Sequence, residues 1–323
     1  MPQGMSASHV LSLQDVSTSP VSSVGRKAAT LARLAGEGFP VPQFFVVPSA
    51  ALGRHLEANG IAWPGPVDAA GGRERLMRLG EDLRAAPMPP AVRGPVLEAY
   101  DGLCRNSRHA RVAVRSSGAE EDAVGASFAG QFTSVLDVTG HDALLAAVAA
   151  CWSSYLSAKS LGYRAERGIT FGAEPRLAVI VQVQVFSQKA GVLFTVHPLE
   201  PGGGTACIEA NFGMGDSVAG GLATPDTVTV SRSGGEVVEA QIGTKRRMTS
   251  VSRESTGTGV HEVDGCRRSS PVLTDAQVRE LLEIGLRIEQ LLGGPQDIEW
   301  AYDAERLWIL QARPITALSP NRG

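Results

Sequence analysis

The stretch that decides the fold lies near the end of the chain, where residues 297–313 read DIEWAYDAERLWILQAR. Two runs of alternating apolar residues flank a polar turn near residue 304, which predicts a β-hairpin. Successive side chains of a strand point to opposite faces. Asp297 and Glu299 are therefore expected on one face of the hairpin, with apolar residues on the other.

The return strand adds two more polar groups to the same face. With the turn centred near residue 304, Glu299 lies roughly opposite Ile309, and Gln311 lies roughly opposite Asp297. The face then gathers two carboxylates, one amide and the guanidinium of Arg313. Carboxylate and amide oxygens are ligands that Mg²⁺ prefers, and arginine suits phosphate oxygens. The pattern fits an edge hairpin with a solvated polar face equally well.

The composition excludes several classes of protein. The chain has 323 residues and a formal net charge of −3, so it lacks the basic excess that displaces counterions from nucleic acid. No apolar run approaches the roughly 18 residues of a membrane span, and the first residues do not resemble a signal peptide. The four cysteines are far apart, which predicts neither a zinc site nor a disulfide framework. We expect a cytoplasmic protein that binds neither nucleic acid nor a membrane.

The order of the predicted elements indicates an α+β fold. Residues 1–20 show no periodicity and are expected to be a loosely ordered lead-in. Mostly helical sequence follows to about residue 108, and strands dominate after about residue 177. A helix over 274–292 covers a sheet, with Thr274 and Gln277 forming a capping box. We expect a two-lobed protein with mixed sheets, an α/β lobe over 1–110 and an α+β lobe over 111–323.

Two basic residues lie where an anion could bind. Lys27 is one of only four lysines and falls in the first turn of a predicted helix, where the helix dipole disfavours a cation. The position suits an anion held jointly by Lys27 and the helix N-terminus, with Gly25 allowing close approach. Arg115 ends an apolar strand and precedes a loop of small residues over 118–131, whose backbone N–H groups could surround phosphates. An exposed lysine and an ordinary surface turn are the simpler interpretations.

A glutamine pair marks one further strand. In LAVIVQVQVF, residues 177–186, Gln182 and Gln184 share a face. One of them could hydrogen-bond an adenine edge, or both could face solvent.

These motifs occur together in a known order. The sequence resembles the N-terminal nucleotide-binding domain of phosphoenolpyruvate synthase, pyruvate phosphate dikinase and rifampin phosphotransferase, from about residue 24 to residue 316. The resemblance implies an ATP-grasp-like fold that holds a nucleotide between two lobes. The segments that carry it are VGRKAATLARL, VAVRSSGAEEDAVGASFAGQF, CWSSYLSAKSLGYRAERGI, AGVLFTVHP, EANFGMGDSVAGG, QDIEW and LQARPIT.

The resemblance implies a set of residues that contact the nucleotide phosphates. Lys27, Arg115 and Arg313 would contact the phosphates and serve as the catalytic residues. Gly130 and Ser134 would belong to the loop that covers them.

The resemblance also implies the remaining contacts of the site. Gln182 would lie near the adenine, and Glu299 and Gln311 would hold Mg²⁺. ATP and Mg²⁺ are therefore the expected cofactors. The metal pair agrees in residue type with the hairpin face worked out from strand alternation.

The sequence departs from the family pattern at several positions. Arg26 replaces the second glycine of a Gly-Gly-Lys motif, Gly118 replaces a usual alanine, and His197 stands where Asp or Asn is common. Family enzymes also carry a phospho-accepting histidine in a Thr/Ser-His-x-Ala context, and none of the six histidines here has that context. These departures leave the phosphate end of the site, and the acceptor above all, as open questions.

Three functions remain open at this point. The first is an ATP- and Mg²⁺-dependent phosphotransferase domain that passes a phosphoryl or pyrophosphoryl group to a histidine on a separate protein or a missing domain, releasing AMP. The second is a stand-alone kinase that phosphorylates a small-molecule acceptor directly. The third is a non-catalytic nucleotide-binding regulatory module.

Overall fold

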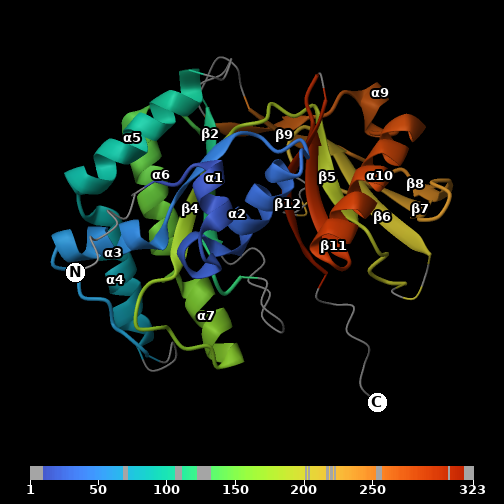
Figure 1. Cartoon of the computed structure of the whole chain (residues 1–323). Coiled ribbons are helices and arrows are strands. Elements are labelled where there is room, and N and C mark those ends of the chain that lie inside the picture. The colour runs from blue at the N-terminus through green and yellow to red at the C-terminus, as the bar shows by residue number, and fades with distance from the viewer. Residues whose placement is uncertain are drawn as a thin grey trace. The chain divides into compact units, whose positions relative to one another are not determined.

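A computed structural model of the whole chain divides into two compact units (Figure 1). Unit 1 comprises Met1–Arg33 and Gln43–Gln184, and unit 2 comprises Leu34–Pro42 and Val185–Gly323. The residues that the structure describes are 10–67, 72–105, 111–121, 132–200, 202, 204–215, 218, 221, 223–251, 257–304 and 306–315.

Unit 1 contains one sheet and a layer of helices. Its strands are β1 (Phe44–Val47), β2 (Val112–Gly118), β3 (Ser134–Val138) and β4 (Leu177–Val183). Its helices are α1 (Leu13–Thr18), most of α2 (Val21–Gly36), α3 (Ser49–Ala58), α4 (Arg73–Ala85), α5 (Pro90–Arg105), α6 (His141–Ser154) and α7 (Ala158–Arg167).

The sheet of unit 1 has the strand order β1-β4-β2-β3, and neighbouring strands are antiparallel. Alternate residues of β2 and β4, among them Val112, Val114, Val179 and Val181, point into the core that the helices cover. Arg115 and Gln182 occupy the positions between these core-facing residues. They therefore lie on the other face of the sheet.

The division into units does not follow the expected lobes over 1–110 and 111–323. β4 pairs with β1 on one side, where Phe44 faces Gln182, and with β2 on the other, where Ala113 faces the same glutamine. One sheet thus joins segments from both expected lobes. The first unit consequently extends to residue 184.

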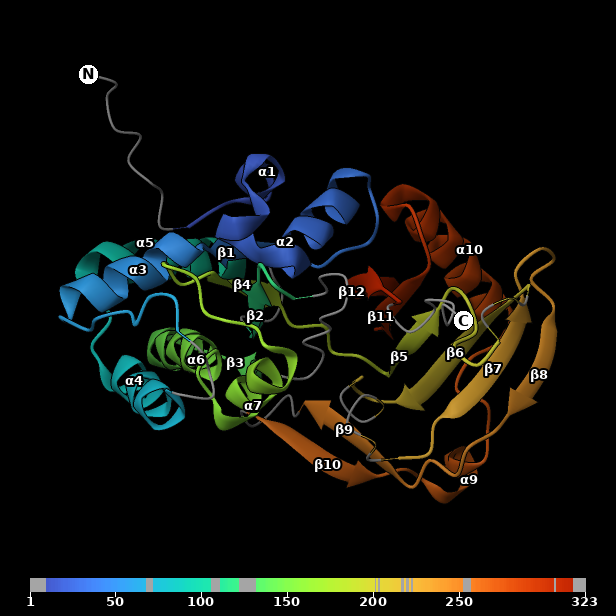
Figure 2. The ribbon, with the colours of Figure 1, turned by 90° about the horizontal axis from the view of Figure 1, so that it is seen from below.

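Unit 2 is built on a larger antiparallel sheet. Its order is β12-β11-β5-β6-β7-β8, and a separate hairpin pairs β9 with β10 (Figure 2). The elements are β5 (Lys189–Phe194), β6 (Thr205–Phe212), β7 (Asp226–Ser231), β8 (Val237–Gln241), β9 (Arg247–Val251), β10 (Thr258–Glu262), α9 (Gly265–Arg268), α10 (Asp275–Leu292), β11 (Gln296–Tyr302) and β12 (Leu307–Pro314).

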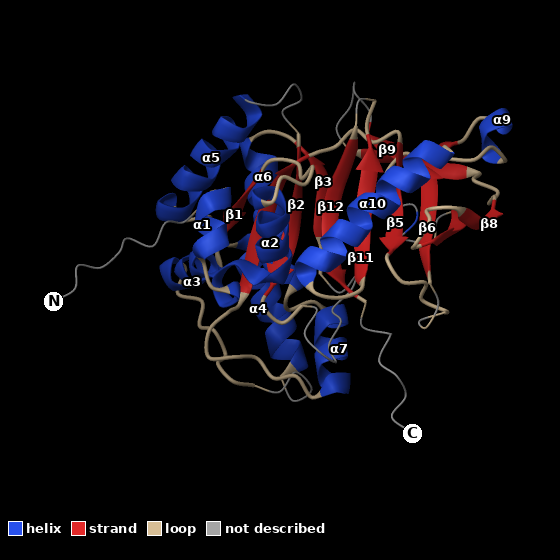
Figure 3. Cartoon of the chain, turned by 45° about the vertical axis from the view of Figure 1, so that its right-hand side comes forward, coloured by secondary structure: helices blue, strands red, loops and turns tan. Residues whose placement is uncertain are grey.

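Helix α10 covers one face of the six-stranded sheet, as the sequence predicted (Figure 3). The Thr274 hydroxyl accepts a hydrogen bond from the Gln277 N–H at 3.3 Å, and the Gln277 side chain accepts one from the Thr274 N–H at 3.1 Å. The helix ends at Gly293, which has a φ of +85°. Its buried residues pack with Ile298 and Trp300 of β11 in the core of unit 2. The predicted α+β class is confirmed.

Two local predictions differ from the structure. The expected loose lead-in contains α1, because Ser12 and Asp15 form a capping box that stabilises this short helix. Apolar residues at helical spacings over 141–168 predict one helical stretch, but the structure has a break between Ser154 and Ala158, where Ser157 caps the start of α7. In both places a single serine side chain, rather than apolar periodicity, determines where the helix begins.

Among the described residues, one helical stretch, 141–167, is long and apolar enough to cross a membrane. Of its most apolar window, 61% is buried inside the protein. Leu144, Val148 and Trp152 of this stretch are fully buried in the unit 1 core. The stretch therefore has the burial of a core helix.

Candidate functional site

The predicted hairpin is present as β11 and β12, but its register differs from the expectation. Glu299 lies opposite Gln311, and Asp297 lies opposite Arg313. The expected pairings of Glu299 with Ile309 and of Asp297 with Gln311 are wrong.

The register differs for two reasons. The Asp303 N–H donates to the Arg306 carbonyl, so the turn is centred beyond residue 304. A β-bulge then adds one unpaired residue, Leu310, to the return strand. Directly opposite residues share a face, with Cβ atoms about 4.5–5.5 Å apart. The structure therefore brings Glu299 and Gln311 closer together than the sequence indicated.

The second pair of the hairpin forms an ion pair. Arg313 Nε donates to Asp297 Oδ2 at 2.8 Å, and its Nη2 lies 2.6 Å from the same oxygen. Asp297 is 8% exposed, and the Arg313 side chain is 26% exposed. The carboxylate thus fixes the plane of a guanidinium that still reaches solvent.

A third acid, Glu209, joins this face of the sheet and was missed in the sequence. Val192 of β5 lies opposite Glu299 on one side and opposite Glu209 on the other, so the two glutamates belong to one row across the sheet. Burial raises the pKa of Glu209, and the negative charge of Asp297 raises it further. The face therefore has an excess of negative charge, which favours a cation.

In unit 1, Lys27 follows a sharp change of direction in α2. Gly25 has φ +77° and ψ 163°, outside the helical region. A Cβ at Gly25 would lie 2.1 Å from the Ser117 carbonyl oxygen, so only glycine permits this approach. The Ala28 N–H donates to the Ser117 hydroxyl at 3.1 Å, which caps the helix that follows Gly25. The expected place of Lys27 in a first helical turn is confirmed.

Lys27 contacts a buried acid. Its Nζ lies 3.1 Å from Glu121 Oε1, and the other oxygen of this carboxylate accepts a hydrogen bond from the Gly118 N–H at 3.0 Å. Both charges lie near Cys151. Burial raises the pKa of that thiol to about 12, while Lys27 lowers it and Glu121 raises it.

The other predicted residues of unit 1 share one face of its sheet. Arg115 lies opposite Ser134 on β3 and opposite Ile180 on β4, and Gln182 follows two residues after Ile180. Gln182 is 1% exposed. Among the described residues, none accepts a hydrogen bond from its Nε2. Gly130 lies outside the described residues.

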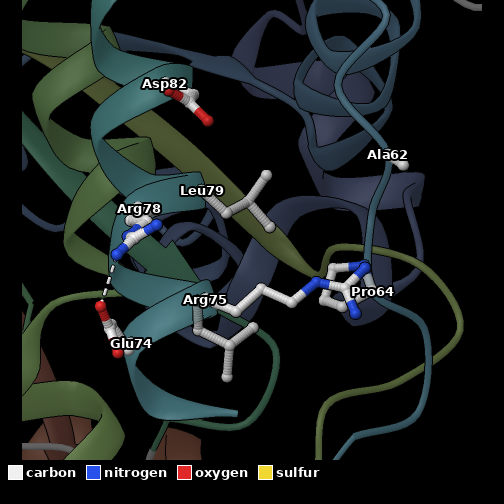
Figure 4. Close-up of a pocket in the computed structure, with 8 residues that line it drawn as sticks. Ala62, Pro64, Glu74, Arg75, Arg78, Leu79 and Asp82 are labelled. Carbon is white, nitrogen blue, oxygen red and sulfur yellow. Dashed lines mark hydrogen bonds and ion pairs between the residues drawn. The ribbon is translucent and has the colours of Figure 1, made fainter.

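A separate groove in unit 1 contains none of the predicted site residues. It measures about 360 Å³ and lies between α4 and the segment 62–64 (Figure 4). Arg78 on its wall is paired with Glu74 at 2.5 Å. The groove is therefore not part of the candidate site.

Comparison with known protein families shows which family the chain belongs to. The family described as "Pyruvate phosphate dikinase, AMP/ATP-binding domain" matches residues 21–323. The chain belongs to this family. As a member it is an ATP/AMP-binding domain of the phosphoenolpyruvate synthase and pyruvate phosphate dikinase type, and its mixed fold with open sheets agrees with an ATP-grasp-like domain.

Relatives of this AMP/ATP-binding domain are longer proteins. It is 34% identical to a probable phosphoenolpyruvate synthase of Methanocaldococcus jannaschii, over 99% of this chain and 28% of that protein. It is 36% identical to a rifampicin phosphotransferase of a Streptomyces species, over 98% of this chain and 37% of that protein. A rifampicin phosphotransferase of Bacillus subtilis is 32% identical over 97% of this chain and 36% of its own length. The chain thus spans well under half the length of these relatives.

The residues of the domain fit the two expected cofactors in type. Among the described residues, no three His, Cys, Asp or Glu side chains gather as a metal site, so a cage made only of these side chains is not seen there. Mg²⁺ is commonly bound through one or two protein ligands, with waters and substrate phosphates completing its shell. Glu299 and Gln311 offer one carboxylate and one amide oxygen on facing strands. The amide of Gln182 offers a buried donor for an adenine nitrogen.

Proposed function

We propose that this domain binds Mg·ATP and passes its β,γ-pyrophosphoryl group to a histidine on a separate protein or a further domain, releasing AMP. A phosphoryl group remains on the histidine when water then removes the terminal phosphate as orthophosphate. The relatives named phosphoenolpyruvate synthase and rifampicin phosphotransferase support a phosphotransferase. The observation that carries the proposal is the hairpin face of unit 2. There Glu299 faces Gln311, and Arg313 is held beside them by Asp297.

The site residues would have to bind a triphosphate that carries several negative charges. Phosphoryl transfer depends mainly on positioning and on neutralising the charge of the phosphate oxygens. Lys27, Arg115 and Arg313 would contact those oxygens, and Ser134 lies opposite Arg115 on the neighbouring strand. Mg²⁺, when bound, neutralises charge on the phosphates. Glu299 and Gln311 would hold it.

Asp297 has an orienting role in this arrangement. The carboxylate contacts two nitrogens of the Arg313 guanidinium, and a guanidinium still has further N–H donors for a phosphate. Because the guanidinium group is planar and rigid, the contact of one edge with Asp297 also fixes the direction in which the other edge points.

Gln182 would recognise the base. A buried amide N–H without an acceptor is costly, at about 1–3 kcal/mol. A nitrogen acceptor of the adenine ring would satisfy it. This contact serves ATP and AMP equally, whereas the contacts of Lys27 favour the triphosphate.

The test is a calorimetric titration of the full chain with Mg·ATP, Mg·ADP and AMP, followed by assay of nucleotide products with histidine-bearing acceptor proteins. Glu299→Ala is expected to remove the Mg²⁺ dependence of ATP binding and to abolish turnover, because it deletes the anionic metal ligand. Glu283→Ala, which changes an exposed acid on α10, is the matched control and should leave both unchanged.

Each outcome distinguishes the alternatives. AMP release together with a phosphorylated histidine supports the proposal. ADP release with a phosphorylated small molecule supports direct transfer instead. Tight Mg·ATP binding that is unaffected by Glu299→Ala would contradict the metal assignment.

A further inference from the structure

The carboxylate of Glu121 holds a position that the proposed function does not explain. It is 1% exposed and lies three residues after the end of β2. One of its oxygens lies 3.1 Å from Lys27 Nζ, and the other accepts the Gly118 N–H at 3.0 Å. A Cβ at Gly118 would lie 3.1 Å from Glu121 Cγ, so the glycine admits this close approach.

Burial constrains what this carboxylate can do. A charge removed from water is stable only when it is both paired and hydrogen-bonded. Lys27 supplies the opposite charge, and the Gly118 N–H supplies a backbone hydrogen bond. The two partners come from different segments, the helix after Gly25 and the end of β2. Glu121 therefore ties Lys27 to the strand that carries Arg115.

The ion pair also restricts Lys27. A lysine side chain has many rotamers, and ordering it when a phosphate binds lowers affinity. The contact with Glu121 orders it beforehand. An ammonium has three N–H donors, so the bond to Glu121 leaves capacity for phosphate oxygens. The side chain is 18% exposed, which keeps it accessible to a ligand.

We propose that Glu121 is a positioning residue that holds the Lys27 ammonium ready for the nucleotide phosphates. This inference rests on the proposed function, since it requires that Lys27 contacts phosphate. The same contacts could have the opposite effect, because a carboxylate that competes with phosphate for Lys27 would weaken ATP binding. The two effects have opposite signs and can be separated by measurement.

The experiment is a double-mutant cycle on the full chain. Mg·ATP and AMP affinities are measured by calorimetry for wild type, Glu121→Ala, Lys27→Ala and the double variant. Glu121→Ala is expected to weaken Mg·ATP binding about tenfold, the scale of coupling between residues in direct contact, with little change for AMP. The double variant should bind Mg·ATP no more weakly than Lys27→Ala alone, because Glu121 acts through Lys27.

Two further variants separate the positioning effect from unfolding and from a general effect of removing a nearby acid. Glu121→Gln keeps the size of the side chain and an acceptor for the Gly118 N–H, and removes the charge. It should show the same selective loss, even where Glu121→Ala unfolds. Glu120→Gln is the matched control. It changes a neighbouring acid that pairs with Arg164 instead of Lys27, so any change it causes in Mg·ATP affinity should be the same in the wild-type and Lys27→Ala backgrounds.

The failures are distinguishable. Unchanged or tighter Mg·ATP binding by both Glu121 variants, with binding weakened by Lys27→Ala, would overturn the positioning role and leave the proposed function intact. A loss from Glu121→Ala that persists in full in the Lys27→Ala background would do the same. If wild type binds no Mg·ATP, or Lys27→Ala binds it as wild type does, the phosphate role of Lys27 fails, and this inference fails with it.

Discussion

Replacing Gly25 by alanine tests the local geometry on which the Lys27 position depends. The backbone of Gly25 has φ +77°, and an added Cβ would lie 2.1 Å from the Ser117 carbonyl oxygen. With ψ 163°, this positive φ lies in a backbone region that is essentially restricted to glycine, and it costs an alanine roughly 1–3 kcal/mol. The overlap is far inside van der Waals contact, and the forced backbone shift adds about 1–3 kcal/mol. We therefore expect Gly25→Ala to lower the free energy of unfolding by about 2–6 kcal/mol.

A control separates the two contributions. Gly60 also has a positive φ, +64°, but a Cβ there meets nothing within 4 Å. Gly60→Ala should therefore cost only the conformational penalty of roughly 1–2 kcal/mol. Urea unfolding followed by circular dichroism measures both variants, and the denaturant slope shows whether they unfold in the same way as wild type.

The same pair of variants has a functional readout. The shift that Gly25→Ala forces on Ser117 disturbs the cap at Ala28 and displaces Lys27. Mg·ATP affinity should fall more than AMP affinity, and Gly60→Ala should change neither. Equal losses of stability in the two variants would refute the reasoning, because the close approach of Gly25 to Ser117 would then contribute nothing.

Three further predictions concern polar groups that are buried or half-buried. Gln182→Met should weaken ATP and AMP binding by the same factor, about 2- to 10-fold for one neutral hydrogen bond, and a loss confined to ATP would contradict an adenine contact. Burial and the charge of Asp297 raise the pKa of Glu209 above its ordinary value of 4.5. The ionised carboxylate therefore destabilises the folded state, and stability is lost as pH rises through the raised pKa. Glu209→Gln should raise the Tm at about pH 7 but not at about pH 4. Burial lowers the pKa of His55 below 6.5, so the unfolded chain binds the proton first and stability is lost as pH falls below about 6.5. Urea midpoints measured across that range should depend less on pH in His55→Gln, and an unchanged pH dependence would exclude His55 as a source.

The sequence predicted those features whose cause is local. The capping box and apolar stripe of α10 involve residues a few positions apart, and so does the alternation that put Asp297 and Glu299 on one face. The place of Lys27 in a first turn, just after a glycine, is local in the same sense. Each of these could be worked out without knowing which strand pairs with which.

Long-range pairing was beyond such reasoning. The sheet of unit 1 joins Phe44 to Gln182, so the compact units extend across the boundary expected near residue 110. The hairpin register depended on the position of the turn and on a bulge at Leu310, which alternation does not reveal. Glu209 was missed for the same reason, since its place beside Glu299 requires β5 to lie between β6 and β11.

Lysine is rare in this chain, and two of its lysines pair with buried acids. Lys27 contacts Glu121, Lys189 contacts Gln277, and Lys245 contacts Asp226. A compact ammonium on an unbranched stem reaches a single buried oxygen, whereas a planar guanidinium needs a wider space. Lys27 and Lys245 each reach a buried carboxylate in this way, whereas the partner of Lys189 is the half-buried amide of Gln277. For Lys27 that carboxylate belongs to Glu121, an acid that the sequence alone does not mark as buried. It lies beside the strand that carries Arg115.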